Sequence, residues 1–221
     1  MNKPEAMNEE NAVDAGDFGS WLTQIIASFR GSAGSEVPCG DCRGCCTSSY
    51  FIHVRPTDRK TLEAVPKALL NPAPGQPRGH KLIGFAEDGS CPLLHERTCS
   101  IYNQRAQTCR DYDCRVFAAA GIAAGDFQRA AINQRIRAWR FSYADDQDKQ
   151  RHRAIKATAS FIEKNRSAFP GGRAPVAPSD IAILAIKVHR VFLTPEARSR
   201  TPADTAEAII RASRDFEAAR E

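Results

Sequence analysis

The chain has 221 residues, 42% of them hydrophobic, so it is long enough to bury one sizeable core or two small ones without disulfide bonds. Its net charge is +5, and no run approaches the roughly 18 consecutive apolar residues of a membrane-spanning helix, which excludes that class of protein. The acidic, polar start shows no basic residues followed by an apolar run, so no secretory signal is evident and we expect a cytoplasmic protein.

The acidic start leads into a predicted amphipathic helix. Between Phe18 and Phe29, apolar residues recur at steps of three and four, and Gly31 supplies a stop signal. The polar face lacks the basic residues that attract anionic lipid, so we expect a helix docked on the core instead of a membrane-surface anchor. Residues 31–38 then form a linker.

The middle of the chain predicts short strands and loops. We expect a strand at 50–54, a helix over 56–70 that breaks near Pro66, and a second strand at 81–86 that turns at Asp88-Gly89. Between them lies a loop rich in proline and glycine.

After Cys114 the pattern becomes helical. Helices are expected over 126–141 and 145–169, followed by an apolar helix capped by Ser179 and a last helix opened by Thr201-Pro202. Residues 115–221 carry nineteen Lys and Arg against twelve Asp and Glu, a net charge of +7.

These elements predict an α+β fold that is mainly α-helical, with a small, irregular, cysteine-rich core containing short strands. An amphipathic helix precedes this core and a helical region follows it. The expected domains are an acidic tail and helix at 1–36, a cysteine-cluster metal-binding domain at 37–120, and a basic helical region at 121–221.

All eight cysteines lie within 76 residues, and they are the candidate metal ligands: Cys39, Cys42, Cys45, Cys46, Cys91, Cys99, Cys109 and Cys114. In a C-x-x-C turn two sulfurs lie on one side of the backbone, and glycines such as Gly40 and Gly44 permit the tight turn. Thiolates select zinc, copper(I) or iron–sulfur clusters over magnesium and calcium. A cytoplasmic location favours metal binding over four disulfides.

The adjacent pair Cys45-Cys46 indicates more than one simple site, because neighbouring side chains diverge. Four-sulfur sites use four cysteines each, so eight fit two adjacent sites, or one site with spare thiols. In either case the second group of cysteines must fold back onto the first. An iron–sulfur cluster is an alternative, although a ferredoxin run would have three residues before its fourth cysteine, where Cys46 follows Cys45 directly.

Charged residues near the cysteines leave two interpretations open. The arginines either donate hydrogen bonds to sulfur and offset its charge or lie on the surface; they are Arg43, Arg97, Arg105, Arg110 and Arg115. Asp111 and Asp113 are expected to be turn residues.

The histidines are weaker signals than the cysteines. His95 is expected on the surface, although it could be a ninth ligand, and His53 and His80 are expected to be structural.

The cysteine pattern resembles the YkgJ-like cysteine-cluster family, described as a zinc- or iron-chelating domain. Its opening C-x-x-C-x-x-C-C matches residues 39–46, and Cys91-Pro-Leu-Leu, Cys99-Ser-Ile-Tyr102 and the later cysteines resemble its second block. The resemblance covers residues 37–116; Ala106 stands where the family usually has proline. It implies that all eight cysteines bind zinc or iron, whether as ions or as an iron–sulfur cluster.

Three functional hypotheses follow. The first is a cytoplasmic metal-binding protein that chelates zinc or iron. The second is an iron–sulfur redox or protein-methylating enzyme, because a flagellin lysine methylase has a similar cluster, although no G-x-G-x-x-G motif follows a strand here. The third is nucleic-acid binding by the basic C-terminal helices, through Arg129, Arg135, Arg137, Arg140, Arg151, Arg153 and Lys156.

Overall fold

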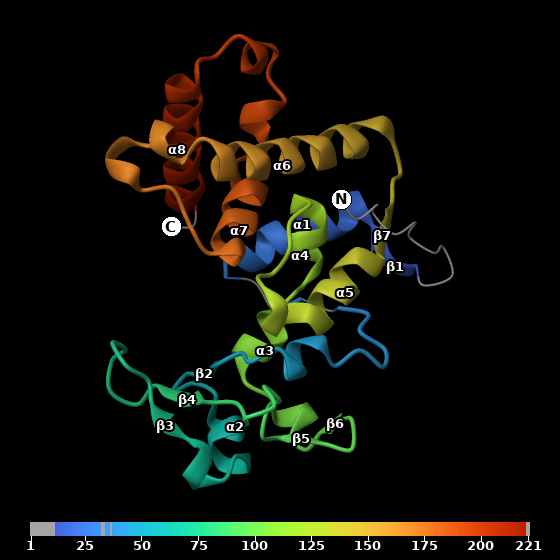
Figure 1. Ribbon diagram of the computed structural model, residues 1–221, viewed down its shortest axis with the longest axis vertical. Helices are drawn as coiled ribbons and strands as arrows, with labels where there is room; N and C mark the ends of the chain where they lie inside the picture. Colours follow the sequence, from blue (N-terminus) through green and yellow to red (C-terminus); the bar gives the residue numbers. More distant parts are fainter. Residues whose placement is uncertain (1–11, 32–33, 36, 220–221) are drawn as a thin grey trace.

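A computed structural model describes residues 12–31, 34–35 and 37–219. It has the expected mainly α-helical α+β fold, arranged as a larger helical lobe and a smaller lobe of short strands (Figure 1). The helices of the larger lobe are α1 Phe18–Phe29, α4 Arg115–Ala120, α5 Ala130–Ala138, α6 Asp146–Lys164, α7 Pro178–Val188 and α8 Pro202–Ala218.

The smaller lobe contains a three-stranded antiparallel sheet of order β2-β4-β3 and a two-stranded hairpin, β5–β6. Its elements are β2 Ile52–Val54, α2 Arg59–Ala64, β3 Asn71–Pro72, β4 Lys81–Ile83, β5 Leu94–His95 and β6 Thr98–Cys99. Helix α3, Gln107–Asp111, lies where the two lobes meet (Figure 1).

Short 3-10 helices connect these elements. They are η2 Gly44–Thr47, η3 Lys67–Leu69, η4 Tyr102–Gln104, η5 Phe127–Arg129, η6 Arg166–Ala168, η7 Pro170–Gly172, η8 His189–Phe192 and η9 Pro195–Arg198.

Helix α1 has the predicted bounds and the predicted apolar face. The Asp17 side chain caps its start by accepting a hydrogen bond from the Ser20 N–H. Phe18, Trp21 and neighbouring apolar residues on this face are buried in the larger lobe. The amphipathic pattern therefore produces a core helix, as expected.

The prediction of one helix over 126–141 is wrong at both ends. Helix α5 covers only Ala130–Ala138, after η5, and residues Trp139–Ser142 form strand β7. This strand pairs in parallel with β1, Val13–Asp17, a segment that we assigned to the tail. Pairing places the Phe141 ring 5.3 Å from that of Phe18, so aromatic packing favours the extended backbone.

Other boundaries also differ from prediction. The two expected strands cover only Ile52–Val54 and Lys81–Ile83, and α2 covers only Arg59–Ala64.

Helix α6 ends at Lys164 instead of continuing to Phe169, and two 3-10 turns follow it. Ser179 does not cap helix α7, because the helix begins earlier, at Pro178, whose fixed φ suits a first helical position. The last helix begins at Pro202 as predicted.

The buried apolar residues form two separate clusters. The larger one joins α1 to helices α4–α8. The smaller one consists of Val54, Val65, Ile83, Leu93, Ile101 and Ala106. Cys114 belongs to the larger cluster, whereas Cys91 and Cys99 pack against the smaller one, so the cysteines lie between two cores.

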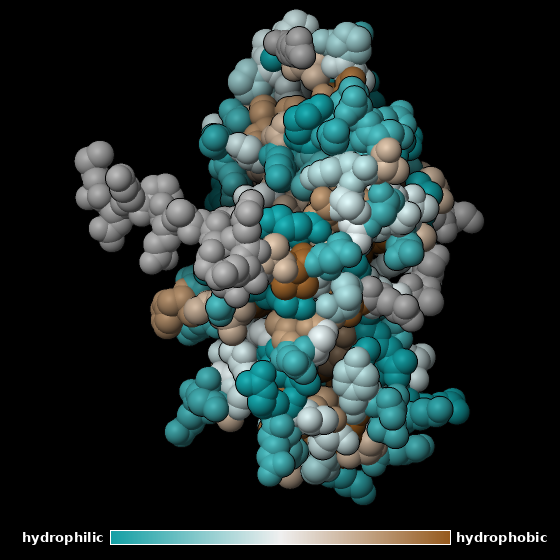
Figure 2. All heavy atoms as spheres, turned by 90° about the vertical axis from the view of Figure 1, so that its right-hand side faces the viewer, coloured by the Kyte–Doolittle hydropathy of each residue, from teal (hydrophilic) through white to brown (hydrophobic). Residues whose placement is uncertain are grey.

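The surface is largely polar. On the face drawn in Figure 2, hydrophilic residues predominate and hydrophobic residues show through in small groups. Within the described ranges, no helix has both the length and the apolar character needed to cross a membrane.

Candidate metal centre

The first four cysteines lie in a tight loop that ends in η2. The Cys42 N–H donates to the Cys39 carbonyl over 3.0 Å, and the Gly44 N–H donates to the Cys42 sulfur over 3.4 Å. Gly40 has φ of +52°, the left-handed conformation that glycine permits. These contacts give the loop the form that the C-x-x-C spacing predicts.

Helix α5 supports this loop from the larger lobe. Gly44 is buried against it, and a side chain there would place its Cβ 3.1 Å from the Ile132 Cα. The Arg135 guanidinium donates to the carbonyls of Pro38 and Cys39, over 3.2 and 2.8 Å. It also stacks on Trp139, with 4.5 Å between the guanidinium carbon and the ring centre.

The second cysteine group meets the first through the backbone. The Cys91 N–H donates to the Cys46 carbonyl over 2.7 Å, and Cys99 pairs with Leu94 in the β5–β6 hairpin. The Arg43 guanidinium donates to the Arg97 carbonyl at the tip of this hairpin. Segments about 50 residues apart in the chain are therefore joined at one place.

The last two cysteines lie on the path from the smaller lobe back to the larger one. Cys109 is half-buried on α3, and Cys114 is buried at the start of α4. The Trp139 indole N–H donates to the Cys114 sulfur over 3.1 Å. All eight described cysteines are free thiols.

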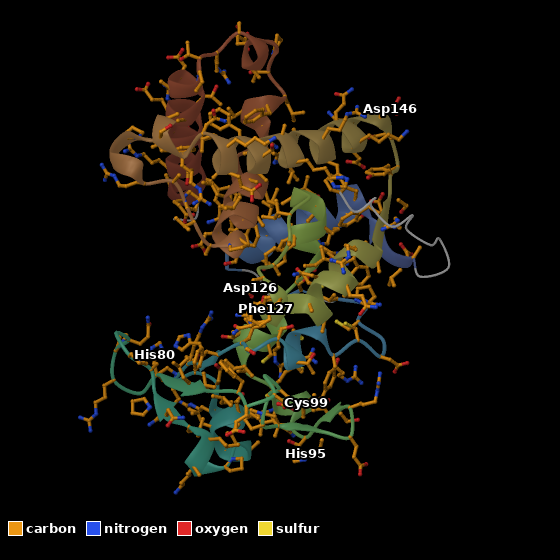
Figure 3. All side chains as sticks on the ribbon, in the orientation of Figure 1. His80, His95, Cys99, Asp126, Phe127 and Asp146 are labelled. Carbon is orange, nitrogen blue, oxygen red and sulfur yellow. The ribbon has the colours of Figure 1, made fainter. Side chains whose placement is uncertain are left out.

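Three of the five histidines, His53, His80 and His95, lie in the smaller lobe. His95 is exposed on the hairpin that also carries Cys99 (Figure 3). His53 and His80 form a hydrogen bond with each other over 2.7 Å, which accounts for both as structural residues of the small sheet. Asp126 and Phe127 lie at the level where the lobes meet (Figure 3).

The surroundings keep most of these thiols protonated in the absence of a cation. Burial raises the pKa of Cys39 and Cys91, and it raises the pKa of Cys109 and Cys114 to about 12. A bound cation would reverse this effect, because metal binding releases protons from thiol ligands.

Cys45 and Cys46 behave differently from each other. Their sulfurs lie 4.0 Å apart and form a hydrogen bond. This bond lowers the pKa of Cys46 to about 7 and raises that of Cys45, since one thiol donates to the ionised other. Cys45 is the exposed member of the set.

A buried carboxylate behind the cysteines was missed by the sequence analysis. Asp113, predicted to be a turn residue, is 4% exposed and accepts hydrogen bonds from the Trp21 indole, the Ser35 hydroxyl and the Arg115 guanidinium. Arg115 also donates to the Ala15 carbonyl. This network ties β1, α1 and the linker to the residue beside Cys114, and the sequence analysis gave neither Asp113 nor Arg115 this role.

Hydrogen bonds from the arginines do not decide between the two roles considered, because the acceptors in these bonds are oxygen atoms. Arg43, Arg110 and Arg115 donate to carbonyls or carboxylates, whereas Arg97 is exposed. Arg105 stacks on Tyr102, 4.0 Å from the ring centre, yet its buried Nε has no hydrogen-bond partner among the described residues.

The donor set fits a soft metal, although the sulfurs do not yet surround a common point. In the part of the chain that the structure describes, no three Cys, His, Asp or Glu side chains form a ready metal site. The chemistry nevertheless matches, because eight thiols suit zinc or iron and the buried Nε atoms of Arg105 and Arg135 lack acceptors that thiolates could provide.

Comparison with known families agrees with this chemistry. Residues 38–138 match the CxxCxxCC family, described as "Putative zinc- or iron-chelating domain". The CxxCxxCC match extends beyond the expected 37–116 to include α5, the helix that supports the cysteine loop. No curated protein and no solved structure matches the chain.

Proposed function

We propose that the protein chelates zinc or iron through all eight cysteines: Cys39, Cys42, Cys45, Cys46, Cys91, Cys99, Cys109 and Cys114. The observation that carries this proposal is that backbone hydrogen bonding joins two separate groups of free cysteines at the boundary between the two apolar cores. The CxxCxxCC match over residues 38–138 supports the same chemistry.

The metal has a structural role in this proposal. The smaller core is made of few side chains, and a lobe of this size gains little stability from apolar burial alone. Metal bound with Cys91 and Cys99 would stabilise the smaller lobe, and metal bound with Cys114 would stabilise the cysteine loop against the larger one. A site closed by four protein sulfurs also leaves no open position for a substrate.

The cytoplasm is the proposed location, because thiols there stay reduced and available for metal. Zinc would supply a redox-inert crosslink, whereas an iron–sulfur cluster would supply electron transfer as well. The two are distinguished by the visible absorbance that iron–sulfur proteins have and zinc–thiolate proteins lack.

The enzyme and nucleic-acid hypotheses gain no specific support. A cleft of about 450 Å³ lies between α1, α6 and η8, and none of the eight predicted metal ligands lines it. Among the basic residues proposed to bind nucleic acid, Arg129 stacks on Tyr50 and Arg151 pairs with Asp148. Arg135 holds the cysteine loop.

Elemental analysis tests the proposal. The full chain, purified anaerobically without added metal, is expected to contain zinc or iron, and a variant with serine at all eight cysteine positions is expected to contain neither. Wild-type protein that is folded by circular dichroism yet free of both metals, and that takes up neither when they are added, would refute the proposal.

A further inference from the structure

The backbone divides the eight cysteines into two groups. In the smaller lobe, the Cys91 N–H donates to the Cys46 carbonyl, and the Leu94 N–H donates to the Cys91 carbonyl over 2.9 Å. Leu94 is in turn the strand partner of Cys99. One continuous set of backbone hydrogen bonds therefore holds Cys46, Cys91 and Cys99 together.

Cys109 joins this group through α3. This helix packs on β2, and the Thr108 hydroxyl donates to the His53 carbonyl over 2.7 Å, which fixes Cys109 on the side of the smaller lobe.

The other group is held by the larger lobe. Arg135 donates to the Cys39 carbonyl and stacks on Trp139, and the Trp139 indole donates to the Cys114 sulfur. Cys42 is tied to Cys39 by its own N–H. A single support made of α5 and β7 therefore positions Cys39, Cys42 and Cys114.

Cys45 lies between the groups and is assigned by exclusion. Cys46 is committed to the smaller lobe by its bond with Cys91. Because a closed site needs four sulfurs, Cys45 completes the group that otherwise has three.

Each group also has an arginine whose buried Nε finds no hydrogen-bond partner among the described residues. Arg135 donates through another nitrogen to the Cys39 carbonyl, and Arg105 lies four residues before Cys109. Two four-thiolate sites holding divalent ions would each carry net negative charge, so a cation beside each one is the arrangement that electrostatics favours.

We infer that the protein contains two separate four-sulfur metal sites, one made by Cys39, Cys42, Cys45 and Cys114 and the other by Cys46, Cys91, Cys99 and Cys109. This assignment rests on the proposed metal-chelating function. The first site is built on the helical lobe, whereas the second lies within the smaller lobe, and the peptide bond between Cys45 and Cys46 links them.

Cobalt(II) titration of the metal-free full chain under anaerobic conditions tests the assignment. Thiolate-bound cobalt absorbs visibly, so the stoichiometry can be read without any activity. We expect wild-type protein to bind two ions, since eight cysteines supply four thiolates for each. Cys39→Ser and Cys114→Ser should each lose one ion, and Cys91→Ser and Cys109→Ser should each lose the other.

Double variants distinguish two sites from one. Cys39→Ser with Cys114→Ser should lose no more cobalt than either single variant, whereas Cys39→Ser with Cys91→Ser should lose both ions. Cys39 and Cys91 are half-buried, so these variants keep the test valid if Cys114→Ser unfolds. A wild-type stoichiometry of one ion, or loss of all cobalt in every single variant, would overturn the division. Failure of wild-type protein to bind any cobalt, zinc or iron would instead refute the proposed function.

Discussion

Replacing Asp113 should destabilise the protein strongly, because this carboxylate is the buried acceptor that connects several elements. It is 4% exposed, lies 2.8 Å from the Arg115 guanidinium, and accepts from the Trp21 indole over 3.0 Å and the Ser35 hydroxyl over 2.7 Å. Removing one partner of a buried ion pair costs about 3–5 kcal/mol. We therefore expect Asp113→Ala to lower the free energy of unfolding by that amount.

Urea denaturation followed by circular dichroism measures this loss. Asp113→Asn keeps an oxygen acceptor and removes the charge, so its stability should lie between those of wild type and Asp113→Ala. Asp146→Ala is a matched control, because Asp146 pairs with Lys149 on the surface and should leave the midpoint almost unchanged. A loss of less than about 1 kcal/mol in Asp113→Ala would show that the network is not a major source of stability.

Two further predictions concern the support of the cysteine loop and the response to acid. Gly44→Ala should lower the free energy of unfolding by about 1–3 kcal/mol and weaken cobalt binding, because its Cβ would lie 3.1 Å from the Ile132 Cα. Gly84→Ala is the control: the nearest contact of its Cβ is 3.9 Å away, so urea denaturation and cobalt titration should both match wild type. Burial lowers the pKa of His152 from 6.5 to about 4. As the pH falls, the unfolded chain therefore binds the proton before the folded chain does. The free energy of unfolding should be unaffected above pH 6.5 and should decrease between pH 6.5 and 4. The full cost is on the order of 3 kcal/mol, since one pKa unit corresponds to about 1.4 kcal/mol. Thermal melts of His152→Gln should show a smaller fall than wild type, and an identical fall would exclude His152 as the cause.

The elements that the sequence predicted well are those with local signals. Helix α1 has a clear apolar stripe and an aspartate cap at Asp17. Helix α8 begins with a capping box, in which Thr201 and Asp204 satisfy each other's backbone N–H groups. Such signals depend on residues three or four apart, so no tertiary information is required to recognise them.

Strands β1 and β7 could not be predicted in the same way, because each depends on the other across more than a hundred residues. The alternation from Trp139 to Ser142, with the first residue buried and the second exposed, was a weak signal for a strand. It lay next to a helical pattern that dominated the prediction. Packing of Phe141 against Phe18 and Trp21 decides the outcome in the folded chain.

In the candidate site, too, residues with a local sequence signal were predicted and residues that depend on distant contacts were not. The cysteines and their chemistry were evident from spacing, because C-x-x-C-x-x-C-C is rare and local. The roles of Arg135 and Trp139 were not, since both act through contacts made by the fold. Asp113 looked like a turn residue because two of its partners, Trp21 and Ser35, lie 92 and 78 positions away in the chain.

Hydrogen exchange of the full chain before and after metal removal tests the structural role of the metal most directly. The account predicts that chelation abolishes protection in residues 39–46 and 91–114 and preserves it in α6 and α7, which pack in the larger core and themselves carry no cysteine. Elemental analysis must show that the metal has left. Unchanged protection around the cysteines in metal-free protein would contradict the claim that the metal stabilises this part of the chain.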